Sequence, residues 1–189
     1  LNMLSSVNFK DIIKINDKQF ELFILENTIL KRIKELSDII KLEVCKDTIF
    51  VCVLKGGFTF FYNLINQLNI IDLKFDFVSV SSYNGKLENG TNVIKSIDLS
   101  TLDYEKKNVI IIEDIIDTGN TINFLKNYYT SKKINSLKIA TLIFKPKYNL
   151  NIVKPDFIGF EIENEFIIGF GMDYLEEGRS LKEIYKLKS

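Results

Sequence analysis

The sequence predicts an α/β fold in which a parallel β-sheet is flanked by helices. The first observation is the run Val109–Ile112, four consecutive β-branched residues, which is typical of a strand buried on both faces. The second is the segment after it, where Ile122, Leu125 and Tyr129 recur at helical spacing. Strand-like and helical segments then alternate along the chain, and this order favours parallel strands joined by right-handed crossovers.

Each expected element follows from its local pattern. Apolar residues recur on one face of the expected first helix, which is therefore amphipathic. A turn at Gly56-Gly57 separates the first expected strand from the next helix. The expected strands are Thr48–Leu54, Phe75–Ser81, Val109–Glu113, Leu137–Phe144 and Asp156–Phe160, and the expected helices are Glu26–Leu42, Phe58–Leu68 and Thr118–Ser131.

One segment breaks this alternation. Residues from Ser82 to Leu99 are polar and rich in turn formers, and they have no period. They predict a long surface loop, and loops of more than about 12–15 residues are usually functional or disordered. A tolerated insertion without function is the alternative reading of the same residues.

Composition excludes several classes of function. The 189 residues fit one domain, and no repeat or linker divides them. Because 25 Lys and Arg balance 25 Asp and Glu, no general field would recruit nucleic acid or an anionic membrane. No stretch approaches the roughly 18–20 apolar residues of a membrane span. The first 20 residues lack the pattern of a signal peptide, so a cytoplasmic location is expected.

Histidine is absent from the chain, which excludes Ser-His and Cys-His catalysis and histidine metal sites. Acid–base chemistry must therefore use Asp, Glu, Lys or Tyr. The two cysteines, Cys45 and Cys52, are expected to be reduced thiols in or near the core, and they have no metal-site spacing.

The segment from Glu113 to Thr121 carries the clearest chemistry. Two acids follow an apolar strand, and an Asp-Thr-Gly turn then opens a helix. Ligands bind at the carboxyl ends of strands in open α/β sheets, and backbone N–H groups at a helix N-terminus bind anions. Carboxylates repel phosphate unless they meet sugar hydroxyls or a bridging divalent cation. The pattern thus implies a phosphorylated sugar with magnesium; the alternative is that Glu113 and Asp114 end a strand in solvent and Asp117 caps the helix.

The segment Glu113–Thr121 resembles the phosphoribosyl-pyrophosphate (PRPP) signature of the type I phosphoribosyltransferases, in the form carried by the hypoxanthine-guanine phosphoribosyltransferases. The resemblance covers about Phe20 to Tyr185, and its C-terminal blocks point to 6-oxopurine bases. Further matching segments, in the family's order, are Leu54-Lys55-Gly56-Gly57, Ser82-Tyr83, Lys145-Pro146, Lys154–Glu161, Glu165–Phe170 and Met172-Asp173-Tyr174.

This resemblance implies one phosphoribosyltransferase domain over residues 1–189, with a small hood subdomain from the chain termini, about 1–25 and 145–189. It implies a mobile lid at about 82–99, closed by Ser82 and Tyr83. It also implies a purine salvage reaction, dependent on Mg²⁺. The reaction joins PRPP to N9 of hypoxanthine or guanine, with xanthine left open, and gives IMP or GMP and pyrophosphate.

The resemblance assigns roles at the sugar-phosphate end. Asp117 becomes the general acid and base for the purine, acting through its position, a closed lid and excluded water more than through basicity in free solution. Glu113 and Asp114 meet the ribose hydroxyls and their magnesium. The residues that hold the 5'-phosphate are Asp117, Thr118, Gly119, Asn120 and Thr121.

At the other end, Lys55 and Gly56 bind pyrophosphate with Arg179, and the peptide between Leu54 and Lys55 is expected to be cis. Lys145 donates to the exocyclic O6, which favours hypoxanthine or guanine over adenine. The remaining assigned residues are Phe166, which stacks on the purine, Ile167, whose backbone reads its edge, and Asp173, which binds a second magnesium.

Two departures from commoner family sequences concern Leu175–Gly178, which bears on the alignment of Arg179, and Lys147-Tyr148, where many bacterial relatives carry Ser-Arg. The family's subunits pair near the pyrophosphate loop, so a homodimer or homotetramer is expected. Two alternatives stay open: a phosphoribosyltransferase for another base, xanthine above all, and a non-catalytic regulator that senses PRPP or nucleotides.

Overall fold

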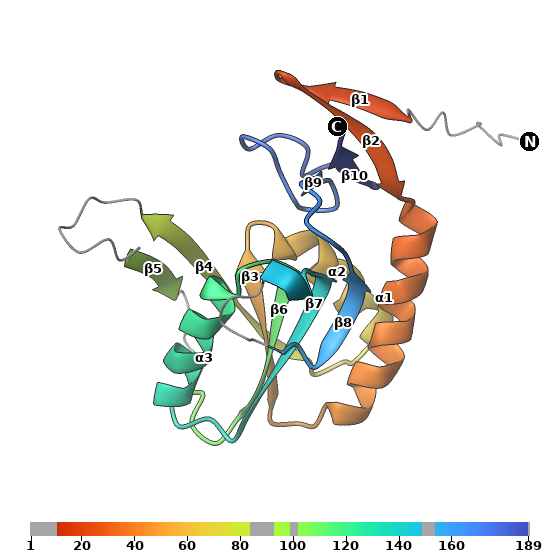
Figure 1. Ribbon diagram of the computed structural model, residues 1–189. Coiled ribbons are helices and arrows are strands. Elements are labelled where there is room, and N and C mark those ends of the chain that lie inside the picture. Colours follow the sequence, from red (N-terminus) through yellow and green to blue (C-terminus); the bar gives the residue numbers. More distant parts are fainter. Residues whose placement is uncertain (1–10, 84–92, 99–101, 149–153, 189) are drawn as a thin grey trace, which may run out of the picture.

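The computed structural model describes residues 11–83, 93–98, 102–148 and 154–188. Its main element is a six-stranded sheet with strand order β5-β4-β3-β6-β7-β8 (Figure 1). Neighbouring strands from β4 to β8 run parallel, and the edge pair β4–β5 is antiparallel. The strands are β3 (Thr48–Leu54), β4 (Lys74–Tyr83), β5 (Val93–Asp98), β6 (Asn108–Ile116), β7 (Ser136–Phe144) and β8 (Phe157–Glu161).

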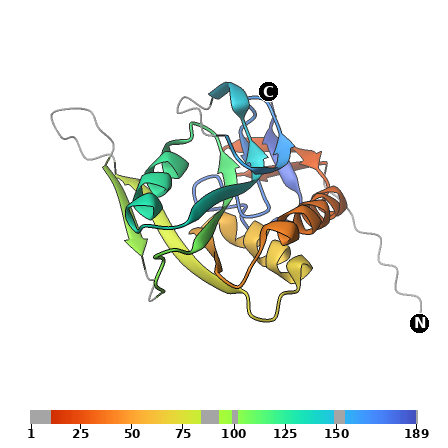
Figure 2. The same cartoon turned by 90° about the horizontal axis from the view of Figure 1, so that it is seen from below.

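In the described residues, three α-helices cover the two faces of this sheet (Figure 2). On β3, Phe50 packs in one cluster with Leu64 of α2, whereas the next residue, Val51, packs with Leu125 of α3. Because both faces are covered, every position of the strand after Thr48 is apolar. The helices are α1 (Glu26–Ile40), followed by a 3₁₀ turn (Lys41–Glu43), α2 (Gly57–Leu68) and α3 (Asn120–Ser131).

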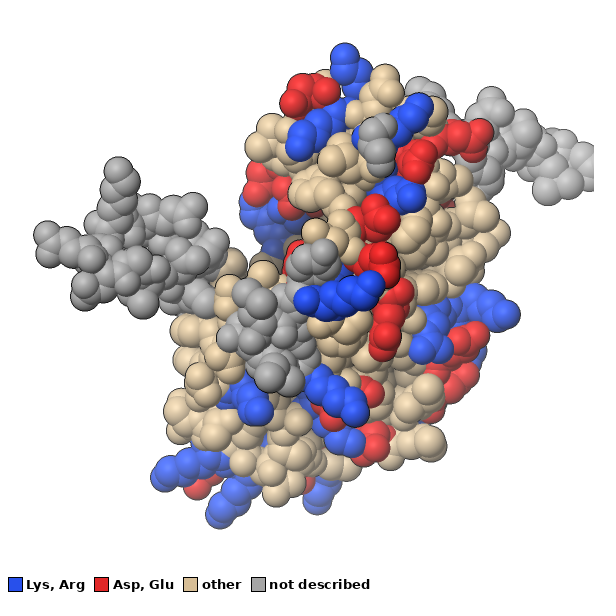
Figure 3. Space-filling view, viewed as in Figure 1, with Lys and Arg blue, Asp and Glu red and all other residues tan. Residues whose placement is uncertain are grey.

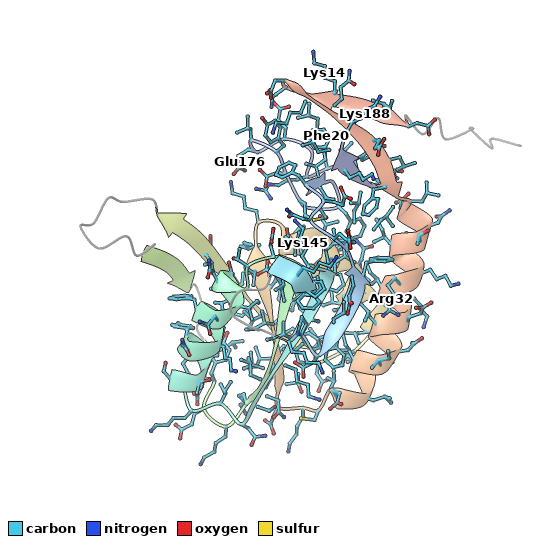
Figure 4. The ribbon with its side chains drawn as sticks, in the orientation of Figure 1. Lys14, Phe20, Arg32, Lys145, Glu176 and Lys188 are labelled. Carbon is cyan, nitrogen blue, oxygen red and sulfur yellow. The ribbon has the colours of Figure 1, made fainter. Side chains whose placement is uncertain are left out.

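Helix α1 is tied to the edge strand β8 by one side chain, Arg32, which Figure 4 labels. Its Nε donates to the carbonyl oxygen of Gly159 and its Nη2 to that of Ile158, both at 2.8 Å. Among the described residues, no helix has both the length and the apolar composition needed to cross a membrane.

A second, four-stranded sheet, at the top of Figure 1, joins residues 12–24 with strands from the C-terminal part of the chain. Its antiparallel strands pair in the order β1-β2-β10-β9 and enclose a small core of Phe20, Ile168 and Tyr185. The sheet uses both predicted hood segments, although their action as a separate subdomain stays a prediction. Its strands are β1 (Ile12–Ile15), β2 (Lys18–Ile24), β9 (Ile167–Ile168) and β10 (Ile184–Leu187).

The predicted fold class is confirmed, but the predicted end of the third strand was wrong. We expected it to stop at Glu113, and β6 instead continues to Ile116. The reason is its central place in the sheet. β6 lies between β3 and β7, and it stays paired with β7 as far as Ile116 and Phe144. The two acids therefore lie within the strand.

The prediction of an irregular loop over Ser82–Leu99 was also wrong in part. β4 runs on to Tyr83, and Val93–Asp98 pairs with it as the antiparallel strand β5. An edge strand tolerates a mixed sequence because its backbone ladder, more than a buried face, holds it in place. Residues 84–92 and 99 of the predicted lid lie outside the described residues.

The two cysteines are free thiols in opposite environments. Cys52 is buried in β3, and burial, followed by the charges of Glu113 and Asp114, raises the pKa of its thiol. Cys45 is exposed in the turn before β3, so its predicted placement in or near the core was wrong. Its sulfur accepts a hydrogen bond from Thr48, which lowers the pKa of the thiol.

Candidate active site

Two adjacent acids near the end of β6 have different environments. Successive side chains of a strand point to opposite faces. Glu113 is 5% exposed, whereas Asp114 is partly exposed. Burial, followed by the neighbouring Asp114 charge, raises the pKa of the Glu113 carboxyl well above its ordinary value. None of the described residues hydrogen-bonds Oε2 of Glu113. A buried acceptor in this state indicates a place for a ligand or a cation.

The chain passes from β6 to α3 through a tight turn at Gly119. This residue has φ 77°, a left-handed conformation that glycine adopts at little cost. The amide of Asn123 donates to its carbonyl oxygen at 2.9 Å and so closes the first helical turn. The start of α3 is thus an anion site of the general kind found at helix N-termini. The predicted phosphate residues, Thr118, Gly119, Asn120 and Thr121, surround it in sequence.

Lys145 and Asp117 form a charged pair beside this turn. The backbone amide of Lys145 donates to the carbonyl of Ile116 at 2.9 Å, which aligns the ends of β7 and β6. Nζ of Lys145 then lies 3.0 Å from Oδ2 of Asp117. Lys145 is 4% exposed and lies at the upper end of the main sheet in Figure 4, so this lysine is not solvated. A buried ammonium is strongly destabilising unless it has a charged partner, and Asp117 is that partner here.

The turn after β3 lies against two other segments without room for side chains. The peptide between Leu54 and Lys55 is cis, as the resemblance implied. A Cβ on Gly56 would overlap the carboxylate of Asp114, and a Cβ on Gly171 would overlap the carbonyl oxygen of Gly56. Gly56 therefore lies against the backbone of Gly171 and against the side chain of Asp114, which come from distant parts of the chain.

A cavity of about 220 Å³ opens at the carboxyl ends of β6 and β7. It receives residues from the main sheet and from the segment 166–173, which includes β9. Lys55, Gly56 and Arg179 are not among its lining residues. The lining residues are Asp114, Ile115, Asp117, Lys145, Phe166, Ile167, Met172 and Asp173.

An aromatic wall borders the cavity, and Phe166 is the ring of this wall that lines it. Phe166 is 43% exposed, and its ring meets that of Tyr174 edge to face, with centroids 5.8 Å apart. Phe20, which is fully buried, lies 6.2 Å from Phe166 between ring centroids. Ile167, which is buried in β9, also lines the cavity. Phe166 is thus placed to stack on a planar ligand.

A chain of ion pairs connects the second sheet to the turn after β3. Arg179 pairs with Asp173 at 2.6 Å and donates from Nη1 to the carbonyl of Gly171 at 2.9 Å. Glu176, on the loop beside the upper sheet in Figure 4, pairs with Lys55 at 3.0 Å. The Lys55 hydrogen bond lowers the pKa of Glu176. Nε of Arg179 is buried and has no partner among the described residues, which leaves one donor for an anion.

Comparisons with known proteins identify the family. The sequence pattern of the phosphoribosyl transferase domain family matches residues 24–175 of the chain. The hypoxanthine-guanine phosphoribosyltransferases of Lactococcus lactis and Bacillus subtilis are 37% and 38% identical to the chain, covering 91% and 89% of it and 93% of each relative. The chain belongs to the hypoxanthine-guanine phosphoribosyltransferase family. Its enzyme class is that of the transferases, and the relatives favour this function over the two alternatives left open by the sequence.

Solved structures agree with this membership. A hypoxanthine phosphoribosyltransferase from Staphylococcus aureus has a TM-score of 0.81 at 34% identity, over 89% of this chain and 91% of that one. A variant of the Trypanosoma cruzi enzyme, solved with its product IMP, has a TM-score of 0.81 at 27% identity, over 93% and 94%. The type I phosphoribosyltransferase fold is thereby confirmed.

The predicted metal residues fit Mg²⁺ only if the ion is shared with a ligand. Within the described part of the chain, no three His, Cys, Asp or Glu side chains gather closely enough to hold a metal, so Glu113, Asp114 and Asp173 build no metal cage of their own. Both oxygens of Asp173 are engaged, by Arg179 and by the amide of Glu176. Mg²⁺ is commonly held by one or two carboxylates with waters and substrate phosphates. The unpartnered Oε2 of Glu113 fits that arrangement.

Two residues of this phosphoribosyltransferase site were not predicted from the sequence. Met172 is 4% exposed and lines the cavity, but a buried methionine has no sequence signal that separates it from other core residues. Glu176 pairs with both Lys55 and Arg179, yet in the sequence it is one acid in a charged loop. Contacts over such sequence distances follow from the fold and not from a motif.

Surface charge agrees with the composition. On the face shown in Figure 3, basic and acidic side chains are interspersed. Attraction of polyanions by the whole face is therefore weak, and binding of a diphosphate depends on the local donors described above.

Proposed function

We propose that the protein transfers the 5-phosphoribosyl group of PRPP to N9 of hypoxanthine or guanine, giving IMP or GMP and pyrophosphate. The observation that carries the proposal is the Lys145–Asp117 pair, which lines the cavity beside the N-terminus of α3. It sets a buried donor and a carboxylate next to an anion site, as base recognition beside a ribose phosphate requires.

At the sugar-phosphate end, the residues from Asp117 to Thr121 hold the 5'-phosphate. Their backbone amides and the hydroxyls of Thr118 and Thr121 supply donors at the start of α3. Glu113 and Asp114 accept hydrogen bonds from the ribose hydroxyls. Lys55, the Gly56 amide and Arg179 bind the pyrophosphate as it leaves.

At the base end, the Lys145 ammonium donates to the exocyclic O6, and the purine stacks on Phe166. An ammonium can donate hydrogen bonds but cannot accept them. A 6-amino group in place of O6 would also be a donor, so it could not pair with Lys145. Met172 also lines the cavity, and the Ile167 backbone reads the edge of the ring. The pocket thus selects 6-oxopurines over adenine.

Asp117 moves the proton. As the bond from the anomeric carbon to the pyrophosphate oxygen breaks, that carbon gains positive charge and the bond to N9 forms. The proton that the purine loses passes to Asp117, which lies within reach of the base by its pairing with Lys145. Closure of Ser82 and Tyr83, at the end of β4, excludes water from the reacting carbon in this proposal.

Bound Mg²⁺, held by Glu113 and Asp114, with Asp173 binding a second ion through water, would offset the negative charge of the departing pyrophosphate. This dependence on Mg²⁺ is proposed from the family and from the buried acceptor on Glu113.

We also propose that two copies pair through the outer face of α2, as a homodimer or within a homotetramer, in the cytoplasm. Phe58 and Tyr62 on this face are 50% and 54% exposed, and their rings stack with centroids 6.5 Å apart. Aromatic rings exposed together in this way favour burial against a partner.

The test is an assay of the purified protein with PRPP, Mg²⁺ and, in turn, hypoxanthine, guanine, xanthine, adenine and uracil. Nucleotide and pyrophosphate should form with hypoxanthine and guanine, and the rate with xanthine ranks the remaining 6-oxopurine. Turnover of adenine at a rate comparable with hypoxanthine, or of no base at all, would contradict the proposal. Lys145→Met is the matched variant, because it keeps side-chain length, removes the donor and should abolish the preference for a 6-oxo group.

A further inference from the structure

The turn between β1 and β2 places a positive charge against the aromatic wall of the cavity. Lys18, the first residue of β2, has its Nζ 4.8 Å from the ring centroid of Tyr174 and 5.7 Å from that of Phe166. Ammonium groups within about 6 Å of a ring centroid are attracted by the electrons of the ring face. One side chain therefore contacts both rings at once.

The second ring, Tyr174, is fixed from two directions. Its hydroxyl donates to Oδ1 of Asp17 at 2.9 Å, and Asp17 directly precedes Lys18 in the turn. The hydrogen bond from Tyr174 lowers the pKa of Asp17, so the acceptor is a carboxylate. The planes of Tyr174 and Phe166 meet at 88°, an edge-to-face contact. The turn thus holds the ring against which Phe166 leans.

Phe166 needs such support because so much of it is open. With 43% of the residue exposed, packing encloses only part of the ring, and the torsion that turns a phenyl ring is broad. Phe20 supports it from the core of the second sheet, at a tilted 40°. Two further contacts of the ring are those with Tyr174 and Lys18.

From these contacts we infer that Lys18 is a positioning residue for the base. It holds Phe166, directly and through Tyr174, in the plane on which the purine stacks, and so sets the affinity for the base without touching the sugar phosphates. The inference rests on the proposed function, since it requires that Phe166 stack on the base.

The experiment compares Lys18→Met, which keeps the length of the side chain and removes its charge, with Lys14→Met on the same hairpin. Lys14 projects outward from that hairpin in Figure 4. KM for hypoxanthine should rise about two- to fivefold in Lys18→Met, the equivalent of one exposed cation–π contact. KM for PRPP and kcat should stay unchanged. Lys18→Arg should restore the affinity for the base, and Lys14→Met should behave as the wild type.

Phe166→Leu distinguishes a failure of the role of Lys18 from a failure of the proposed stacking of the base on Phe166. In that background Lys18→Met should have no further effect on KM for hypoxanthine, because the ring that Lys18 positions is gone. If Phe166→Leu alone leaves this KM unchanged, stacking on Phe166 is refuted. If Phe166→Leu raises it and Lys18→Met does not, the role of Lys18 is refuted and the function stands. An equal effect of Lys18→Met in both backgrounds, with a lower melting temperature, would instead show a purely structural lysine.

Discussion

The two sheets of this protein differ in the length of their strands and in how far the strands are covered by helices. Strands of the main sheet, such as β3, are almost entirely apolar because helices cover both faces. In the second sheet β1 has 4 residues and β9 has 2, and the pairing of β2 with β10 joins segments from opposite ends of the chain. The site spans both, with its sugar-phosphate end on the main sheet and its aromatic wall on the second.

This difference separates chemistry from positioning. The main sheet fixes Asp117, Lys145 and the start of α3 through strand pairing that extends to the last residues of β6 and β7. The second sheet supplies groups held by side-chain contacts, such as Phe166 and Arg179. Changes on the main sheet should therefore affect turnover most, and changes on the second should affect affinity or stability.

The largest effect is expected from Asp117→Asn on the main sheet. Asparagine keeps the size of the side chain but cannot accept the proton of the purine, so kcat should fall by about a hundredfold or more. PRPP binding should largely survive, because the amides and hydroxyls around Gly119 are unchanged. Steady-state rates and calorimetric titration with PRPP measure the two effects, and unchanged turnover would remove Asp117 from the proposed role.

A smaller effect is expected where the sheets touch. Gly171 has φ 103°, and a Cβ there would overlap the carbonyl oxygen of Gly56. Gly171→Ala should therefore lower the free energy of unfolding by about 1–3 kcal/mol, the usual range for one strained residue. Urea titration followed by circular dichroism measures it.

Gly56→Ala is the matched control for this contact between Gly171 and Gly56. Gly56 has φ −60° and ψ −44°, which alanine adopts freely, and a Cβ would meet only the Asp114 carboxylate, which can turn away. The free energy of unfolding should change by less than about 1 kcal/mol, while KM for PRPP rises. Equal destabilisation by both variants would contradict the view that the backbone contact at Gly171 is the one that tolerates no side chain.

The smallest effect concerns the buried acid of the main sheet. The raised pKa of Glu113 means that, above about pH 4.5, the unfolded chain loses this proton before the folded protein does. Stability associated with Glu113 is thus present below that pH and is lost as the pH rises through the raised value. Relative to the wild type, Glu113→Gln should gain stability as the pH rises above about 4.5. Melting temperatures in the presence of a chelator measure this, and parallel pH curves would contradict it.

Prediction from the sequence was most successful where the structure depends on neighbours in the chain. The strand Thr48–Leu54 and the turn around Gly119 were predicted because an apolar run and a helix start are both local patterns. The exposed Cys45 and the strand β5 were missed because burial and antiparallel pairing depend on distant segments.

The same reasoning explains the gaps in the site. Lys145 could be placed at the end of a strand, but its pairing with Asp117 needed the register of β6 and β7. Lys18 carried no signal, since its partner Tyr174 lies at the other end of the chain.

The hydrogen bonds of Arg32 have a consequence for solubility. An outermost strand offers open carbonyl groups, through which separate molecules can join edge to edge into fibres. At β8 the guanidinium of Arg32 donates to the carbonyl oxygens of Ile158 and Gly159, so this part of the strand is already engaged within the molecule. A side chain that anchors a helix thereby also guards the folded enzyme against aggregation along this border.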